Sequence, residues 1–68
     1  MLDELVRMSV KGWTYVVGSI QSANGKPYIV RIESPDGQVV TKGPFVTDNE
    51  ARVVMAEART RVEKGALP

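Results

Sequence analysis

Residues 43–51 mark the point where a two-residue hydrophobic periodicity stops and a helical periodicity begins. Thr47 and Glu50 have the spacing of a capping box. In that motif the threonine hydroxyl accepts from the backbone N–H three residues on, and the glutamate carboxylate reaches back to the threonine N–H. The pattern therefore predicts a helix over residues 48–64, beginning at Asp48.

The predicted helix carries one apolar stripe, which needs a sheet to cover it. Apolar residues recur along it at i, i+3, i+4, i+7 and i+11: Ala51, Val54, Met55, Ala58 and Val62. Lys64 followed by Gly65 predicts the end of the helix, because glycine takes the left-handed position after the last turn. Residues 65–68 are then a short tail.

Residues 13–45 predict a three-stranded antiparallel meander. Aromatic and β-branched residues from Trp13 onward favour a first strand. Asn24-Gly25 predicts a two-residue hairpin loop, and Pro35-Asp36-Gly37 predicts a second turn. The third strand is expected to end at about Lys42, before Gly43-Pro44, because proline cannot donate to a ladder.

The N-terminal segment, residues 1–11, is predicted to form a short helix because Leu2, Leu5 and Val6 fit a helical spacing. The whole chain, residues 1–68, is then a single α+β domain with the order βββα. Its 68 residues lie near the lower limit of length at which a single hydrophobic core can hold a fold without disulfide bonds or a structural metal.

The two turns also predict a register, which sorts the side chains between the two faces of the sheet. A two-residue loop at Asn24-Gly25 places Ile20 opposite Ile29 and Val17 opposite Ile32, and a glycine bulge in the second turn places Ile32 opposite Val40. The face assigned to the helix, because it buries the most apolar area, carries Trp13, Tyr15, Val17, Tyr28, Val30, Ile32 and Val40. The other face carries Thr14, Val16, Gly18, Ile20, Ile29, Arg31, Glu33, Val39 and Thr41. Phe45 is expected to fill the junction between sheet and helix.

Four aliphatic residues on the second face, Val16, Ile20, Ile29 and Val39, are more than a chain of this size usually exposes. Three interpretations follow. The favoured one is that Leu2, Leu5 and Val6 of the N-terminal segment cover them. The others are that a second copy of the chain packs on them in a symmetric dimer, or that they bind another protein.

Composition excludes several functional classes. Histidine and cysteine are absent, so zinc, haem and iron–sulfur sites lack their usual ligands and no cofactor is expected. No two acids are predicted to converge and no serine has a base beside it, so we expect neither enzymatic activity nor a small-molecule substrate.

The apolar runs are too short for a membrane span, and residues 1–10 carry acids where a signal peptide carries bases, so a cytoplasmic protein is expected. Nine bases against eight acids give a net charge of +1, so any nucleic-acid binding must come from a local patch.

Three motifs lie in the segment from Gly25 to Gly65, which covers roughly two-thirds of the chain: Gly25-Lys26-Pro27-Tyr28, Pro35-Asp36-Gly37, and Gly43-Pro44-Phe45-Val46-Thr47 leading into Glu50-Ala51. With these motifs the chain resembles the AP2-like group, especially the arm-type DNA-binding domains of phage-type tyrosine integrases. The last motif is similar to that family's Gly-x-Phe-x-Thr-x-x-Glu-Ala pattern. The resemblance implies a small non-catalytic module, of phage or mobile-element origin, whose sheet lies in the DNA major groove.

By position, the resemblance implies DNA contacts from Lys26, Arg31, Lys42, Thr14 and Thr41. The chain departs from the family in having few bases on its strands, in placing Glu33 and aliphatic residues among them, and in directing Lys42 toward the helix. From the residues alone, the favoured interpretation of Arg31 is a cross-strand partner of Glu33, Thr14 or Thr41. For Lys26 and Lys42 it is that they keep the chain soluble and protect strand edges.

Two alternative functions remain open. The first is a protein-interaction module, either a homodimer or a small regulator of a larger partner, that uses Val16, Ile20, Ile29 and Val39. The second is double-stranded RNA binding, because helix, three strands, helix is also the order of that family. Thr47-Asp48-Asn49 stands where that family usually has a Ser-Lys-Lys phosphate clamp.

Overall fold

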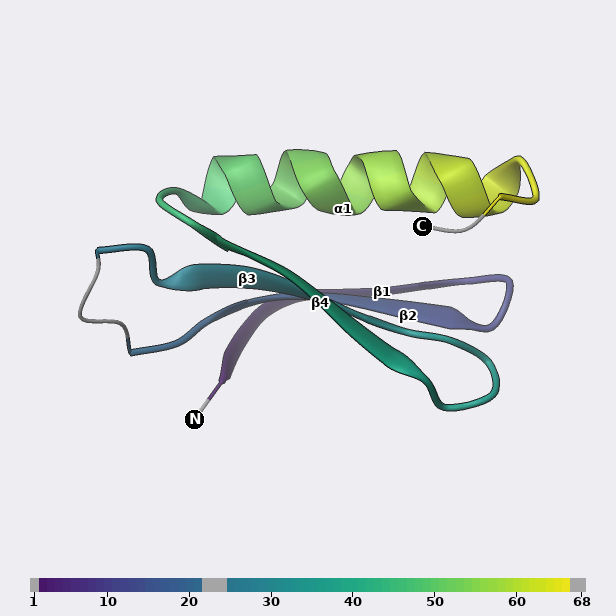
Figure 1. Cartoon of the computed structure of the whole chain (residues 1–68), viewed down its shortest axis with the longest axis horizontal. Helices are drawn as coiled ribbons and strands as arrows, with labels where there is room; N and C mark the ends of the chain where they lie inside the picture. Colours follow the sequence, from purple (N-terminus) through teal and green to yellow (C-terminus); the bar gives the residue numbers. More distant parts are fainter. Residues whose placement is uncertain (1, 22–24, 67–68) are drawn as a thin grey trace.

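A computed structural model describes residues 2–21 and 25–66 of the chain. It contains the strands β1 (Asp3–Val10), β2 (Trp13–Ser19), β3 (Tyr28–Glu33) and β4 (Val39–Phe45), followed by the helix α1 (Asp48–Glu63). The strands form one antiparallel sheet in the order β1-β2-β3-β4, and α1 lies along one face of it (Figure 1). The α+β class is confirmed, but the sheet has four strands where three were predicted.

The additional strand is β1, which takes the place of the predicted N-terminal helix. Lys11 and Gly12 have φ angles of 52° and 82°. Two successive positive φ angles are what a type I′ hairpin loop requires. The loop turns the chain directly from β1 into β2, with Val10 opposite Trp13.

The helical prediction for this segment was wrong because two periodicities overlap in it. Leu2, Leu5 and Val6 fit a helical spacing, whereas Val6, Met8 and Val10 alternate as in a strand. A helix this short has little stability of its own, whereas a hairpin with β2 provides partners for the backbone. The alternating pattern therefore prevails.

The pairing of β2 with β3 differs by two residues from the predicted register. Val17 lies opposite Val30 and Gly18 lies opposite Ile29. The Ile20 N–H donates to the Pro27 carbonyl at 2.7 Å, so Ile20 faces Pro27 and not Ile29 as predicted. The predicted Asn24-Gly25 turn lies partly outside the described residues. Because side chains alternate with a period of two, the shift leaves each of them on its predicted face.

The β3–β4 turn follows the prediction. Ile32 lies opposite Val40, the Ser34 N–H donates to the Gln38 carbonyl at 2.8 Å, and Gly37 has a φ of 93°. A glycine in the left-handed region is what a bulged hairpin turn requires.

β4 continues beyond its predicted end at Lys42. Val30 pairs with Lys42 but Tyr28 pairs with Phe45, so β4 holds one extra residue in a bulge next to Gly43 and Pro44. The missing N–H of Pro44 is tolerated because β4 is an outer strand.

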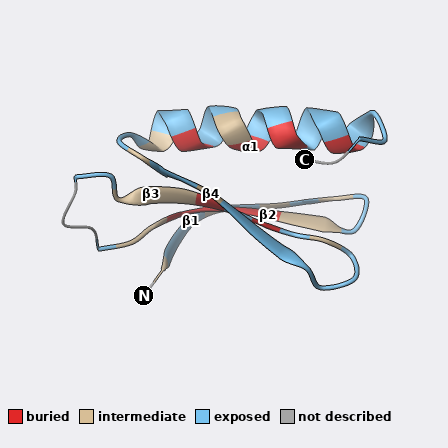
Figure 2. Ribbon diagram, in the orientation of Figure 1, coloured by how far each residue is buried: buried red, intermediate tan, exposed pale blue. Residues whose placement is uncertain are grey.

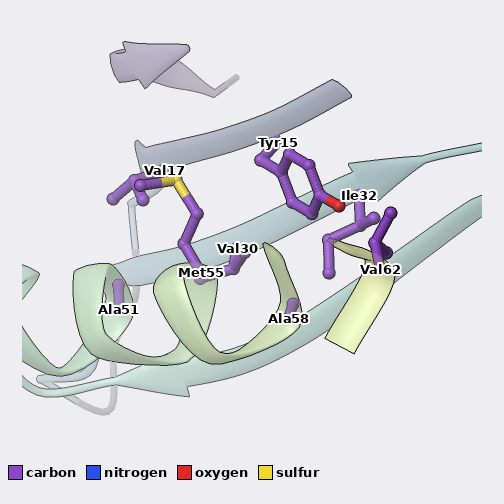
Figure 3. Packing of buried hydrophobic residues seen from close by; sticks show 8 residues of the cluster. All are labelled: Tyr15, Val17, Val30, Ile32, Ala51, Met55, Ala58 and Val62. Carbon is purple, nitrogen blue, oxygen red and sulfur yellow. The ribbon is translucent and has the colours of Figure 1, made fainter. Parts of the chain in front are cut away.

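The core lies between α1 and the faces of β2 and β3 that were assigned to the helix (Figure 3). Tyr15, Val17, Val30 and Ile32 are all 0% exposed. From α1 the buried residues are Ala51, Met55, Ala58 and Val62, and Figure 2 shows the buried side of the helix facing the sheet. Half-buried side chains complete the cluster: Val6, Met8, Val10, Trp13, Tyr28, Phe45 and Val54. Val40 belongs to this face by register but is 46% exposed, because it lies on the outer strand.

The ends of α1 are capped as the sequence indicates, with one difference. The Thr47 hydroxyl accepts from the Glu50 N–H at 3.2 Å, but the Glu50 carboxylate accepts from the Val46 N–H at 3.3 Å instead of the Thr47 N–H. At the other end, Gly65 has a φ of 82° and its N–H donates to the Val62 carbonyl at 2.9 Å. The helix itself ends at Glu63, one residue before the predicted end.

Candidate nucleic-acid interface

The face of the sheet opposite α1, called here the open face, is built from alternate residues of all four strands. No element of the described chain lies over it. The register places these side chains on it: Glu4, Arg7 and Ser9 from β1, Thr14, Val16 and Gly18 from β2, Ile29, Arg31 and Glu33 from β3, and Val39 and Thr41 from β4.

One row across the open face brings two arginines together. Arg7 lies opposite Val16, Val16 lies opposite Arg31, and Arg31 lies opposite Thr41. Directly opposed residues on adjacent strands have Cβ atoms about 5 Å apart. Val16 is only 6% exposed although no helix covers it. Long arginine side chains can bury apolar surface with their aliphatic stems while the charged heads stay in water. Two arginine residues therefore flank the buried Val16 in this row.

Around this row the open face is hollowed. The hollow has a volume of about 270 Å³ and is lined by Leu2, Glu4, Arg7, Thr14, Val16, Arg31 and Glu33. It combines two cations, two carboxylates and a threonine hydroxyl over the Val16 side chain. Such a lining suits a polar, charged ligand surface.

The two arginines that line the hollow differ in whether a carboxylate is paired with them. Arg7 donates to a Glu4 carboxylate oxygen from Nη2 at 2.7 Å and from Nε at 2.9 Å. These hydrogen bonds lower the pKa of the Glu4 carboxyl and raise the pKa of Arg7, to which Glu33 adds a weaker attraction. Among the described residues, Arg31 has no carboxylate within ion-pair distance. Arg31 is therefore the more available cation, and Arg7 must exchange Glu4 for any anion that it binds.

The structure brings three of the five residues predicted to contact DNA onto the open face. Thr14, Arg31 and Thr41 lie there on adjacent strands. Lys42 lies opposite Val30 and so belongs to the helix side, as its register predicted. Lys26 is exposed in the connection between β2 and β3, beyond the ends of both strands.

The four aliphatic residues of the alternative partner site do not form one patch. Val16 is buried in the arginine row, and Val39 lies opposite Glu33 on the outer strand, where it is 48% exposed. Ile29 lies opposite Gly18 and is half-buried, as is Ile20 nearby in sequence. Ile20 and Ile29 lie at the same end of the sheet, which is called here the apolar end of the open face.

The favoured cover for this face, Leu2 with Leu5 and Val6, is largely wrong. Val6 lies opposite Val17 on the helix side, and Leu5 is 47% exposed at the bulge in β1. Leu2 alone lies over the open face, packed against Gly18 so closely that a Cβ there would collide with it. The open face thus stays accessible apart from its apolar end.

Arg7, Glu4 and Ser9 belong to the candidate site but were missed by sequence reasoning, because their segment was predicted to be helical. The signal that identifies them is the alternation of Val6, Met8 and Val10 followed by a two-residue break before Trp13. That pattern predicts a hairpin and places Arg7 on the same face as Val16.

No protein-family model, curated protein or solved structure matches the chain. Within residues 2–21 and 25–66 no group of three or more acidic side chains is placed to hold a metal ion. No helix in this described part is long and apolar enough to cross a membrane.

Proposed function

We propose that the chain is a small non-catalytic nucleic-acid-binding module that uses the open face of its sheet. The observation that carries the proposal is the row in which Arg7 and Arg31 flank Val16, with Thr41 at its end. The resemblance to arm-type DNA-binding domains supports the same surface.

The arginine and hydroxyl side chains of the open face each have a defined role in the proposal. The Arg31 guanidinium binds a phosphate or the edge of a guanine, since both accept two parallel hydrogen bonds. The hydroxyl groups of Thr14, Thr41 and Ser9 donate to phosphate oxygens, which positions the duplex without reading its sequence. Arg7 joins them after its bond to Glu4 is exchanged for a phosphate.

Binding of this kind is expected to be weak and to decrease as the salt concentration rises. Each phosphate neutralised contributes about −0.9 to the slope of log K against log salt concentration on B-form DNA. With Arg7 and Arg31 as the main cations and Glu4 and Glu33 beside them, the slope should be small in magnitude.

The experiment is a titration of labelled mixed-sequence duplex DNA at low and moderate salt. Arg31→Ala should weaken binding severalfold and reduce the magnitude of the salt slope by about 1. The matched control is Arg61→Ala, which removes the same charge from the exposed side of α1. Absence of binding, or equal loss in both variants, would overturn the proposal.

A second candidate function is protein interaction through the apolar end of the open face. It is favoured by the balance of charge in the hollow, where Glu4 and Glu33 offset Arg7 and Arg31, and by the half-buried Ile20 and Ile29. A face-to-face dimer formed in this way should dissociate when Ile29→Glu places a carboxylate at its centre. Sedimentation of the unmodified chain and of Ile29→Glu distinguishes the two candidate functions. If the chain is a nucleic-acid-binding module, the two proteins should have the same mass in solution.

A further inference from the structure

The outer edge of β1 is more regular than the outer edge of β4. These are the two outer strands of the sheet in the described chain. β4 is interrupted by the bulge beside Gly43 and by Pro44, which has no N–H. β1 bulges only between Glu4 and Val6, and from Val6 to Val10 it pairs with β2 without interruption. A regular, unprotected edge is a template for pairing with another strand.

The hairpin geometry determines which backbone groups of β1 are available at this edge. In a hairpin with a two-residue loop, the residues that flank the loop exchange both hydrogen bonds, and bonded and non-bonded pairs then alternate. Val10 and Trp13 flank the loop, so Met8 with Tyr15 and Val6 with Val17 are the next bonded pairs. The N–H and C=O groups of Arg7 and Ser9 therefore point away from β2.

The side chains along the same edge are apolar on the helix side. Val6, Met8 and Val10 pack against the core but stay half-buried, because α1 lies over β2, β3 and β4. The Met8 sulfur lies 3.5 Å from Nη1 of Arg59 on α1. Apolar surface is therefore left beside the unpaired backbone groups.

We propose that a second copy of this chain pairs antiparallel with β1 around a two-fold axis at Met8. Arg7 of each copy then lies opposite Ser9 of the other and exchanges backbone hydrogen bonds with it. Val6 lies opposite Val10 of the other copy, and the two Met8 side chains meet on the axis. The interface is isologous and closes after two copies.

Charge favours this register over the registers in which the two-fold axis lies at another residue of β1. An axis at Arg7 would place the two arginines directly opposite each other, and an axis at Ser9 would place Arg7 opposite Lys11. Like charges directly opposite on adjacent strands are destabilising. An axis at Val6 would extend the pairing into the bulge between Glu4 and Val6. Only the Met8 register places Arg7 beside a neutral, hydrogen-bonding residue on a regular strand.

The dimer is expected to be weak and dependent on concentration. Pairing along one short edge buries less area than the roughly 1,200 to 2,000 Å² of a stable interface. Because the axis runs perpendicular to the sheet, both helices lie on one side and both open faces on the other. The dimer does not depend on the proposed nucleic-acid binding, since it uses the edge and the helix side of β1.

A cysteine cross-link tests the register directly, because the chain contains no cysteine of its own. In a non-hydrogen-bonded antiparallel pair the Cα atoms are about 4.5 Å apart, which is within the range that a disulfide spans. Met8→Cys should therefore form a covalent dimer under mild oxidation at protein concentrations where dimer is populated. The matched control is Val40→Cys, on the helix side of the other outer strand and 46% exposed. Equal cross-linking of the two variants would overturn the assignment to β1.

Sedimentation of the unmodified chain, from about 1 μM to about 1 mM, provides an independent measurement. A mass that rises toward twice the monomer supports the proposal, and a monomer throughout this range overturns it. Met8→Lys and Met8→Glu should each be monomeric where the unmodified chain dimerises, and their mixture should recover the dimer because opposite charges then meet on the axis. Val40→Lys should leave the dimer intact. Far-UV circular dichroism checks that each variant is folded.

Discussion

The two faces of β3 have opposite surroundings although they are formed by neighbouring residues of one strand. Val30 and Ile32 are 0% exposed beneath α1, whereas Arg31 and Glu33 are exposed on the open face. The strand geometry is the same on both sides. The difference comes from the helix, which removes one face from water and leaves the other available for contacts.

Val16 and Val17 show the same contrast on β2. Both are buried, but Val17 lies in the close-packed cluster under α1, whereas Val16 lies between Arg7 and Arg31. Side chains on a free surface can rearrange when a neighbour changes, whereas those under a helix are held by their packing. We therefore expect the helix side to determine stability and the open face to determine binding.

The largest difference between the faces should appear on truncating adjacent residues of β3. Ile32→Ala should lower the free energy of unfolding by about 2 to 5 kcal/mol, because it leaves a cavity in the core. Glu33→Ala should stay within about 0.5 kcal/mol of the unmodified chain. Urea denaturation measures both, and similar losses in the two variants would contradict the assignment of the faces.

Removing the hydroxyl of Tyr15 should stabilise the helix side. The residue is 0% exposed, and its hydroxyl has no hydrogen-bond partner within the described part of the chain. An unsatisfied buried group costs about 1 to 3 kcal/mol, so Tyr15→Phe should raise the free energy of unfolding by about 1 kcal/mol. Urea denaturation at neutral pH should show the gain. A loss of stability in Tyr15→Phe would indicate that the hydroxyl has a partner.

Alkaline pH should enlarge the difference between Tyr15→Phe and the unmodified chain. Burial raises the pKa of the Tyr15 hydroxyl, with a smaller contribution from Glu63. The stability that depends on its neutral form is complete below the unfolded pKa of about 10, and is lost as the pH rises through the folded pKa. Tyr28 is present in both proteins, so the difference between their urea midpoints isolates Tyr15.

An effect of similar size, but of opposite sign, is expected at the cap that starts α1. Thr47→Ala removes the acceptor for the Glu50 N–H and should cost about 1 kcal/mol. Thr47→Ser keeps the hydroxyl and should recover most of the loss. The midpoint of thermal unfolding should fall from the unmodified chain to Thr47→Ser and then to Thr47→Ala. Equal midpoints for all three proteins would show that the cap does not stabilise the helix.

The smallest effect is expected on the open face, at the exposed pair of Glu4 and Arg7. Arg7 lowers the pKa of the Glu4 carboxyl, so the stability from this pair is present above the unfolded pKa of about 4.3 and is lost as the pH falls through the folded pKa. Glu4→Gln should therefore differ from the unmodified chain at neutral pH and converge with it in acid. Urea midpoints of the two proteins from neutral to acid pH provide the measurement. A difference in midpoint that does not change with pH would contradict a contribution from the ionised Glu4.

Much of the helix side could be predicted because local signals agree there. The Thr47 cap, the stripe from Ala51 to Val62 and the Gly65 stop each have a short-range cause, and each is present in the structure. The aromatic residue Tyr15 was assigned correctly to this side even though the β2–β3 register was wrong by two residues. Side-chain faces are preserved by a shift of two, so the error did not reach the core.

The open face could be predicted only in part because one of its four strands was not recognised. Residues 3–10 fit two periodicities, and local propensity does not decide between them. Arg31, Thr14 and Thr41 were placed on this face from their strands, whereas Arg7 comes to lie on it only through pairing of β1 with β2. The bulge next to Gly43, which extends β4 to Phe45, likewise depends on contact with β3.

The sequence by itself determined where α1 begins, where it ends to within one residue, and which face of residues 13–45 it covers. Those properties follow from caps, turns and alternation, which act over a few residues. The tertiary structure alone decided that the N-terminal residues become a fourth strand, which places Arg7 next to Val16 and leaves the edge of β1 free. The physical reason is that strand pairing satisfies backbone groups across distant segments, and a short apolar pattern does not specify which partner it will find.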